Sequence, residues 1–280
     1  MAQPIAHNDY LPGYAPKQVQ HHEWRNAENS AAYLLPTLQQ KAKENPSLSL
    51  LDVGAGSGTI TASLAKYMPQ GQINATDLSE EILLRAKEFA DQADASNISF
   101  QQASVYELPF PEGSFDVVHA SMVLCHLDSP VQALKEMLRV AKPDGGIVAC
   151  RESDLRMWSF YPKLPGLEKT HKLQLAVHEA AGGSIDGGAK LVSWAMQADA
   201  TRDQITASFG TWCYSTPEER GIWGNTMAER VRYGGMRQKG LEMKITTEAE
   251  LKEMTEAWDE WVATEDACLG CMHGEIIIRK

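Results

Sequence analysis

The stretch Leu50-Leu51-Asp52-Val53-Gly54-Ala55-Gly56-Ser57-Gly58-Thr59 decides the fold of this chain. An apolar run, Leu48 to Val53, ends in three glycines at alternate positions, and a stretch compatible with a helix, residues 60–67, follows them. Because glycine has no Cβ, such a turn lets the backbone approach a ligand closely. The start of the helix also points free N–H groups at that ligand. The stretch therefore predicts a strand, a ligand-binding turn and a helix.

A second acid, Asp77, ends the next apolar run, residues 73–77. This position predicts a carboxylate at a second strand tip, where ribose-binding acids lie in nucleotide-binding folds. The dinucleotide fingerprint G-x-G-x-x-G would suit NAD, but here Gly58 comes one residue early. An NAD site and a purely structural glycine turn stay open as alternatives on these residues alone.

Strand and helix patterns alternate on both sides of the glycine stretch, which predicts a mainly parallel sheet with helices on both faces. A helix is expected first, from residue 19 or 29 to residue 43. Strands are predicted at residues 49–53, 72–76, 98–102, 115–121, 146–150, 205–214 and 274–279, and helices at 60–67, 79–93, 130–140, 167–181, 189–200, 216–233 and 247–263. Residues 157–165, with three aromatic residues and two prolines, are expected to form an irregular loop.

The motif Asp52-x-Gly54-x-Gly56-x-Gly58 resembles the first motif of class I S-adenosylmethionine (SAM) dependent methyltransferases. Residues 107–116, ELPFPEGSFD, and residues 138–146, LRVAKPDGG, are similar to signatures of the UbiE-like small-molecule methyltransferases. The resemblance implies a Rossmann-like seven-stranded, mostly parallel sheet whose last strand is antiparallel. It also implies an N-terminal helical lid in residues 1–45, a SAM-binding core in 46–155, and substrate-side helices with two final strands in 156–280.

The same resemblance assigns the cofactor contacts. Gly54, Gly56 and Gly58 are expected to pack against the methionine part of SAM, and Asp52 to anchor the loop and the amino group. Asp77 is expected to accept hydrogen bonds from both ribose hydroxyls, because a carboxylate offers two oxygens. The remaining expected contacts are Leu78 on the adenine, Ser104 and Val105 at its edge, and Arg25 with the SAM carboxylate.

The methyl acceptor is expected outside the carboxyl ends of the strands, where ligands of doubly wound sheets bind. His126, after the fourth strand, is predicted to shape the acceptor pocket or to act as a general base. Glu152, after the fifth strand, is predicted to bind substrate or take a proton, and either side chain could instead be structural. The other expected acceptor contacts are aromatic residues and one histidine: Tyr10, Tyr14, His22, Trp24, Trp158 and Tyr161.

The composition limits which kinds of binding partner are expected. A formal net charge of −11 and the absence of Lys/Arg clusters argue against a nucleic-acid partner. No stretch resembles a signal peptide or a membrane span, so a cytoplasmic protein with a small-molecule acceptor is expected, with a homodimer possible in principle. Five cysteines, including Cys268-x-x-Cys271, are too irregular for a disulfide framework or a zinc site, so no metal is predicted.

The leading hypothesis is therefore methyl transfer from SAM, leaving S-adenosylhomocysteine (SAH), to O, N, S or activated C of a small, largely apolar molecule. Positioning and desolvation would supply most of the catalysis. Two alternatives share the fold. One is an arsenite-type methyltransferase that uses several cysteines, and the other is a catalytically silent SAM-binding scaffold or regulator.

Overall fold

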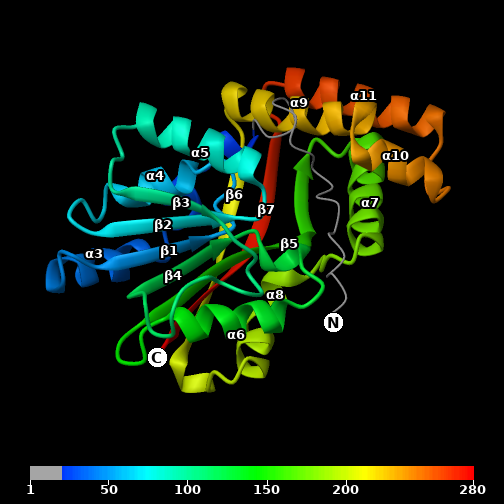
Figure 1. Cartoon of the computed structure of the whole chain (residues 1–280). Helices are drawn as coiled ribbons and strands as arrows, with labels where there is room; N and C mark the ends of the chain where they lie inside the picture. Colours follow the sequence, from blue (N-terminus) through cyan, green and yellow to red (C-terminus); the bar gives the residue numbers. More distant parts are fainter. Residues whose placement is uncertain (1–20) are drawn as a thin grey trace.

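A computed structural model describes residues 21–280 of the chain (Figure 1). Its centre is a seven-stranded sheet in the order β3-β2-β1-β4-β5-β7-β6. The strands are β1 (Ser49–Val53), β2 (Gln72–Asp77), β3 (Ile98–Gln102), β4 (Val117–Ser121), β5 (Ile147–Tyr161), β6 (Ile205–Tyr214) and β7 (Cys268–Arg279). Strands β1 to β5 pair in parallel, whereas β7 is antiparallel to both β5 and β6. The predicted fold class is confirmed.

Helices cover both faces of this sheet because successive side chains of each strand point to opposite sides. On one face, α6 (Pro130–Val140) and α8 (Gly187–Gln197) pack on Leu51, Val118 and Val148. On the other face, α2 (Ala27–Ser30), α3 (Leu35–Glu44) and α4 (Thr59–Ala65) pack on Leu50 and Val117. Helix α5 (Glu80–Gln92) lies beside α4 and β3, and the short helices η1 (Leu124–His126) and η2 (Arg202–Gln204) complete the set of connections.

A helical cap forms a third layer at the extended ends of β5, β6 and β7 (Figure 1). It consists of α7 (Pro165–Ala180), α9 (Pro217–Tyr233), α10 (Gly235–Glu242) and α11 (Glu248–Ala263). Its core contains Trp258 and Trp261, both fully buried, packed with Trp212 and Leu269 of the strands. The indole N–H of Trp258 donates to Thr170 Oγ1 at 3.2 Å, which ties α11 to α7.

Three expectations about elements are wrong, and one helix was not expected. Residues 157–161 belong to β5 rather than to a loop, because β5 continues past β4 and pairs with β7 up to the Tyr161–Cys268 pair. Strand β7 likewise begins at Cys268, not at residue 274, and α10 was not predicted. The expected first helix is divided into α2 and α3, with Pro36 in the first turn of α3, where its missing N–H costs nothing.

Candidate active site

The glycine turn after β1 has three positive φ angles, +69° at Gly54, +55° at Gly56 and +74° at Gly58. A Cβ at Gly54 would lie 2.4 Å from a methyl carbon of Val123, and one at Gly58 would lie 2.8 Å from the Cβ of Ala86 in α5. A Cβ at Gly56 would meet no heavy atom within 4 Å. Gly56 therefore faces open space suited to a ligand. Gly58 instead permits α4 to approach α5, and it does not line the adjacent cavity, contrary to the expectation of cofactor contact.

That cavity, of about 240 Å³, lies at the carboxyl ends of β1 to β4, the usual ligand position in such sheets. We call it the cofactor cavity. The residues predicted to contact SAM that line it are Arg25, Asp52, Gly54, Gly56, Asp77, Leu78, Ser104 and Val105. Segments far apart in the chain thus meet in one place, as the sequence predicts.

Asp77 ends β2 and faces the glycine turn. One carboxylate oxygen accepts the Gly56 N–H at 3.0 Å and the other accepts the Ser79 N–H at 3.1 Å. Burial raises the pKa of Asp77, although these backbone hydrogen bonds act in the opposite direction. The carboxylate is therefore fixed in orientation at the edge of the cofactor cavity.

Asp52 belongs to a buried polar cluster that the sequence did not reveal. One carboxylate oxygen lies 2.8 Å from Nδ1 of His119 on β4, and the other accepts the Thr61 hydroxyl at 2.5 Å. His119 is fully buried and lines the cofactor cavity, and its Nε2 has no hydrogen-bond partner within residues 21–280. The pair arises from the register of β1 and β4, in which Asp52 is opposite His119. His119 thus places a buried imidazole in the wall beside the position predicted for the amino-acid end of SAM.

Two smaller contacts complete the cofactor cavity. Leu78 is 50% exposed, so its side chain lies at the cavity mouth, where an adenine ring could cover it. The hydroxyl of Ser104 accepts the Tyr106 N–H at 3.3 Å. The serine is therefore engaged in its own turn as well as lining the cavity.

A second cavity, of about 100 Å³, adjoins the first and extends under the helical cap. We call it the acceptor cavity. Its aromatic walls are Trp158, Trp212 and Trp223. His22, Arg25, Met122 and His126 line both cavities and so mark their junction. Trp158 and His22 are therefore in the predicted region, whereas Trp212 and Trp223 were not predicted.

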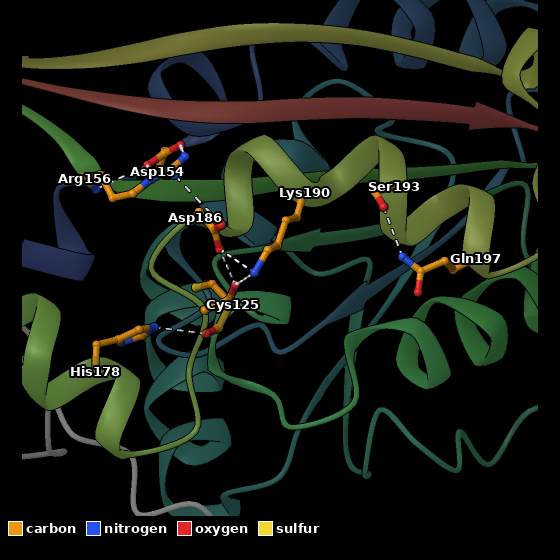
Figure 2. Close-up of polar contacts among 9 residues, drawn as sticks. Cys125, Asp154, Arg156, His178, Asp186, Lys190, Ser193 and Gln197 are labelled. Carbon is orange, nitrogen blue, oxygen red and sulfur yellow. Dashed lines mark hydrogen bonds and ion pairs between the residues drawn. The ribbon is translucent and has the colours of Figure 1, made fainter.

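His126, at the junction, is held by neighbours from η1 and α7. Its ring packs edge-on against His178 with centroids 5.2 Å apart. His178 in turn lies with Nε2 3.0 Å from the Cys125 carbonyl oxygen (Figure 2). Burial, with additional repulsion from His178, Arg25 and Arg230, lowers the pKa of His126 to about 3. A neutral imidazole with so low a pKa suits a wall of the pocket better than a general base.

Glu152 is fully buried beneath η1 and does not line either cavity. Its Oε1 accepts the N–H groups of Val123 and Leu124 at 3.0 and 2.9 Å, and Oε2 accepts the Cys125 N–H at 3.1 Å. Glu152 therefore positions the loop that carries His126 and does not contact substrate. The neighbouring acid Asp154 is paired with Arg156 at 2.7 Å (Figure 2).

Four other expected acceptor contacts differ from the structure or fall outside it. Trp24 lines neither cavity and packs on Trp212 and Tyr214, with centroids 5.8 and 5.0 Å apart. Tyr161 is 57% exposed at the end of β5, because the strand alternation directs it outward. Tyr10 and Tyr14 lie outside the described residues.

None of the five cysteines lines the cofactor cavity. Strand alternation separates Cys268 from Cys271, and Cys268 Sγ instead lies 3.6 Å from Cys213 Sγ. Cys125, His126 and His178 have potential ligand atoms within 4.8 Å of one another. Burial raises the pKa of the Cys125 thiol well above its usual value, so the thiol stays protonated, and Arg25 and Arg230 in the same cavity oppose a cation.

Comparisons with known proteins agree with this geometry. A family model described as a methyltransferase domain matches residues 51–149. An uncharacterized methyltransferase of Schizosaccharomyces pombe is 33% identical over 100% of this chain and 99% of its own length. The probable methyltransferase ltbC of Aspergillus luteorubrus is 31% identical over 98% of each chain.

Among solved structures, a phosphoethanolamine N-methyltransferase of Haemonchus contortus, in complex with phosphomonomethylethanolamine and SAH, shares the fold. The two structures match with a TM-score of 0.55 at 16% sequence identity. The match covers 99% of this chain and 61% of that one. No helix within residues 21–280 is long and apolar enough to cross a membrane. The full-length relatives, the matched domain and the seven-stranded fold together show that this chain is a class I SAM-dependent methyltransferase.

Proposed function

We propose that the enzyme transfers the methyl group of SAM to O, N, S or activated C of a small, largely apolar organic molecule held in the acceptor cavity. The observation that carries this proposal is the junction of the two cavities at His22, Arg25, Met122 and His126. A methyl donor in the cofactor cavity would present its reactive carbon to a molecule between the three indoles. The aromatic walls favour an apolar acceptor.

The protein's own contribution is positioning and exclusion of water. A sulfonium already carries its leaving group, so the bound cofactor supplies the electrophilic methyl carbon. The Gly56 backbone and Asp77 fit the amino-acid and ribose parts, because one leaves open space and the other offers a fixed carboxylate. The buried side chains around His126 would exclude water and hold the two reactants close together. Both effects strongly accelerate reactions between two molecules.

We further propose that residues 21–45, the described part of the predicted N-terminal lid, cover both cavities. His21, His22 and Arg25 from this part line the acceptor cavity, and the Thr59 hydroxyl donates to the His22 carbonyl at 3.1 Å. That hydrogen bond links the lid to the start of α4, beside the cofactor. Closure of the lid would complete the desolvation that methyl transfer needs.

Incubation with SAM carrying a deuterated methyl group and a metabolite extract tests the proposed function. Mass spectrometry is expected to find a small organic product that has gained one labelled methyl group, together with SAH. The Asp77→Asn variant should form the labelled product and SAH much more slowly than the wild-type enzyme. Tight SAH binding without any labelled product would favour the silent scaffold, and labelled product only after addition of arsenite would favour the arsenite-type alternative.

A further inference from the structure

Unpaired polar atoms on side chains that line the acceptor cavity indicate what it binds. Among residues 21–280, Nε1 of Trp158, Nε1 of Trp223, Oε1 of Gln174 and Nδ1 of His273 are buried and have no hydrogen-bond partner. They come from β5, α9, α7 and β7, and all of these side chains line the acceptor cavity. An unsatisfied buried polar group costs about 1–3 kcal/mol, and such groups are few in folded proteins. A group of such atoms around one cavity points to a polar ligand that satisfies them.

The polarity of these atoms restricts the ligand. An indole N–H only donates a hydrogen bond, so Trp158 and Trp223 require acceptor atoms on the ligand. Their rings are neighbours, with centroids 5.6 Å apart. By contrast, Trp212 lines the same cavity but already donates its N–H to the Asn29 carbonyl at 2.7 Å. Only two of the three indoles therefore offer a donor.

The charges of the described lining have one sign. Arg25 and Arg230 line the acceptor cavity, and no carboxylate among residues 21–280 does so. The Arg25 guanidinium stacks over Trp212 at 4.7 Å from the ring centroid, and Arg230 reaches His21 Nε2 at 3.1 Å. A positive lining with unpaired N–H donors favours an oxygen that carries negative charge. The same charges oppose an ammonium ligand, which the indole walls alone would otherwise suit.

We propose that the methyl acceptor is a small flat ring compound with an acidic oxygen, either a carboxylate or a phenol, that accepts hydrogen bonds from Trp158 and Trp223. A hydroxyl or N–H elsewhere on the ring donates to Gln174. This inference rests on the proposed function and names the chemistry of its acceptor. A cavity of about 100 Å³ leaves no room for more than a single small ring, since an engineered cavity of about 150 Å³ binds benzene.

Calorimetry on the SAH-saturated enzyme tests the proposal with two matched pairs of single-ring probes. Benzoate is compared with its neutral counterpart benzamide, and phenol with toluene. At least one acid is expected to bind about tenfold or more tightly than its counterpart, a difference of about 1.4 kcal/mol. The pair that shows the difference identifies the acidic group. No preference in either pair, no binding of any probe, or tighter binding of benzylamine than of benzoate would overturn the proposal.

Variants then assign the preference to the named groups. Trp223→Phe keeps an apolar wall and removes one N–H, so it should lower the affinity for the preferred acid about fivefold to tenfold and leave toluene nearly unchanged. Trp212→Phe is the matched control, because its N–H is already engaged, and should retain the preference. Arg230→Met should also reduce the preference, whereas Arg232→Met, which removes a surface partner of Asp259, should not.

SAH affinity separates the possible failures. A variant that still binds SAH normally is folded and has an intact cofactor cavity, so its acid preference can be interpreted. If the wild-type enzyme binds no SAH, the proposed function itself fails. If it binds SAH but shows no acid preference, only the present inference fails.

Discussion

Single residues of the glycine turn have different tasks that the sequence motif does not distinguish. All three glycines adopt positive φ, but only Gly56 faces open space, whereas Gly58 lies against Ala86. The motif can be read from the sequence because the backbone conformation is local. The division of tasks depends on α5, which is more than 20 residues away along the chain, and therefore needs the structure.

Two alanine substitutions should separate these tasks. Gly58→Ala should lower the melting temperature by several degrees, because a left-handed alanine costs about 1–2 kcal/mol and its Cβ would clash with α5. Gly56→Ala should destabilise less but weaken SAH binding at least about tenfold, because its Cβ enters the cofactor cavity. Thermal unfolding and calorimetry check both. Wild-type SAH affinity in Gly56→Ala would contradict the assigned role of Gly56.

His126 can be tested by the pH dependence of methyl transfer. Burial, His178 and the two arginines lower the pKa of its imidazole to about 3, so it stays neutral at and above about pH 5. His126→Asn should therefore change the rate without changing the shape of the pH–rate profile. An ionisation near about pH 6.5 that is present in the wild type and absent from the variant would instead identify His126 as a general base.

At the scale of elements, the parallel half of the sheet was the easier half to predict. Strands β1 to β4 are short and end in clear turns, so apolar runs locate them to within two residues. Strand β5 was predicted five residues long because Trp158 and Phe160 beside prolines resemble a loop. Its continuation depends on pairing with β7, more than 100 residues later, with a register irregularity between Ser153 and Trp158. Local patterns cannot reveal that pairing.

The helical cap illustrates the same limit for the site. A capping box at Thr247 and Glu250 predicts the start of α11 correctly, because both residues belong to one turn. The acceptor cavity, in contrast, takes Trp158 from β5, Gln174 from α7 and Trp223 from α9. No spacing rule connects these residues. Most residues that line the cofactor cavity were predictable because they lie at the ends of consecutive strands, whereas most residues that line the acceptor cavity were not.

The η1 loop should depend on Glu152. Glu152→Gln replaces one carboxylate oxygen by an NH₂ group that cannot accept from the backbone amides of Val123, Leu124 and Cys125. The loss of at least one charge-assisted hydrogen bond should cost about 1.5–3 kcal/mol and lower the melting temperature. Methyl transfer should fall more than SAH affinity, because the loop carries His126. The surface substitution Glu112→Gln is the control, and equal behaviour of the two variants would contradict this role.

For the whole molecule, buried neutral imidazoles link stability to pH. Burial, the largest cause in each case, lowers the pKa of His22, His126, His178 and His273. Below about pH 6.5 the unfolded chain binds protons that the folded chain does not, so stability is fully present above that pH and is lost as the pH falls. Each such imidazole lowers the free energy of unfolding by up to about 1.4 kcal/mol for each pH unit below that value.

Urea unfolding at about pH 7 and about pH 5.5 checks this dependence. The free energy of unfolding should be lower at the lower pH, and His126→Asn should show a smaller difference because one of the imidazoles is gone. The raised pKa values of Asp77 and Glu152 have the opposite effect, because they stabilise the folded state as the pH falls. This effect occurs only at pH values nearer the ordinary carboxyl pKa range. Equal stability of the wild-type protein at the two pH values would refute this linkage.

The central claim for the molecule is that SAM binds where the ends of β1 and β2 bring Gly56 and Asp77 together. Calorimetric titration with SAM and with SAH tests it most directly. One site per chain is expected, with micromolar or tighter affinity, weakened at least about tenfold by Asp77→Asn and unchanged by the surface substitution Asp91→Asn. No heat of binding with either ligand, or undiminished affinity in Asp77→Asn, would contradict it.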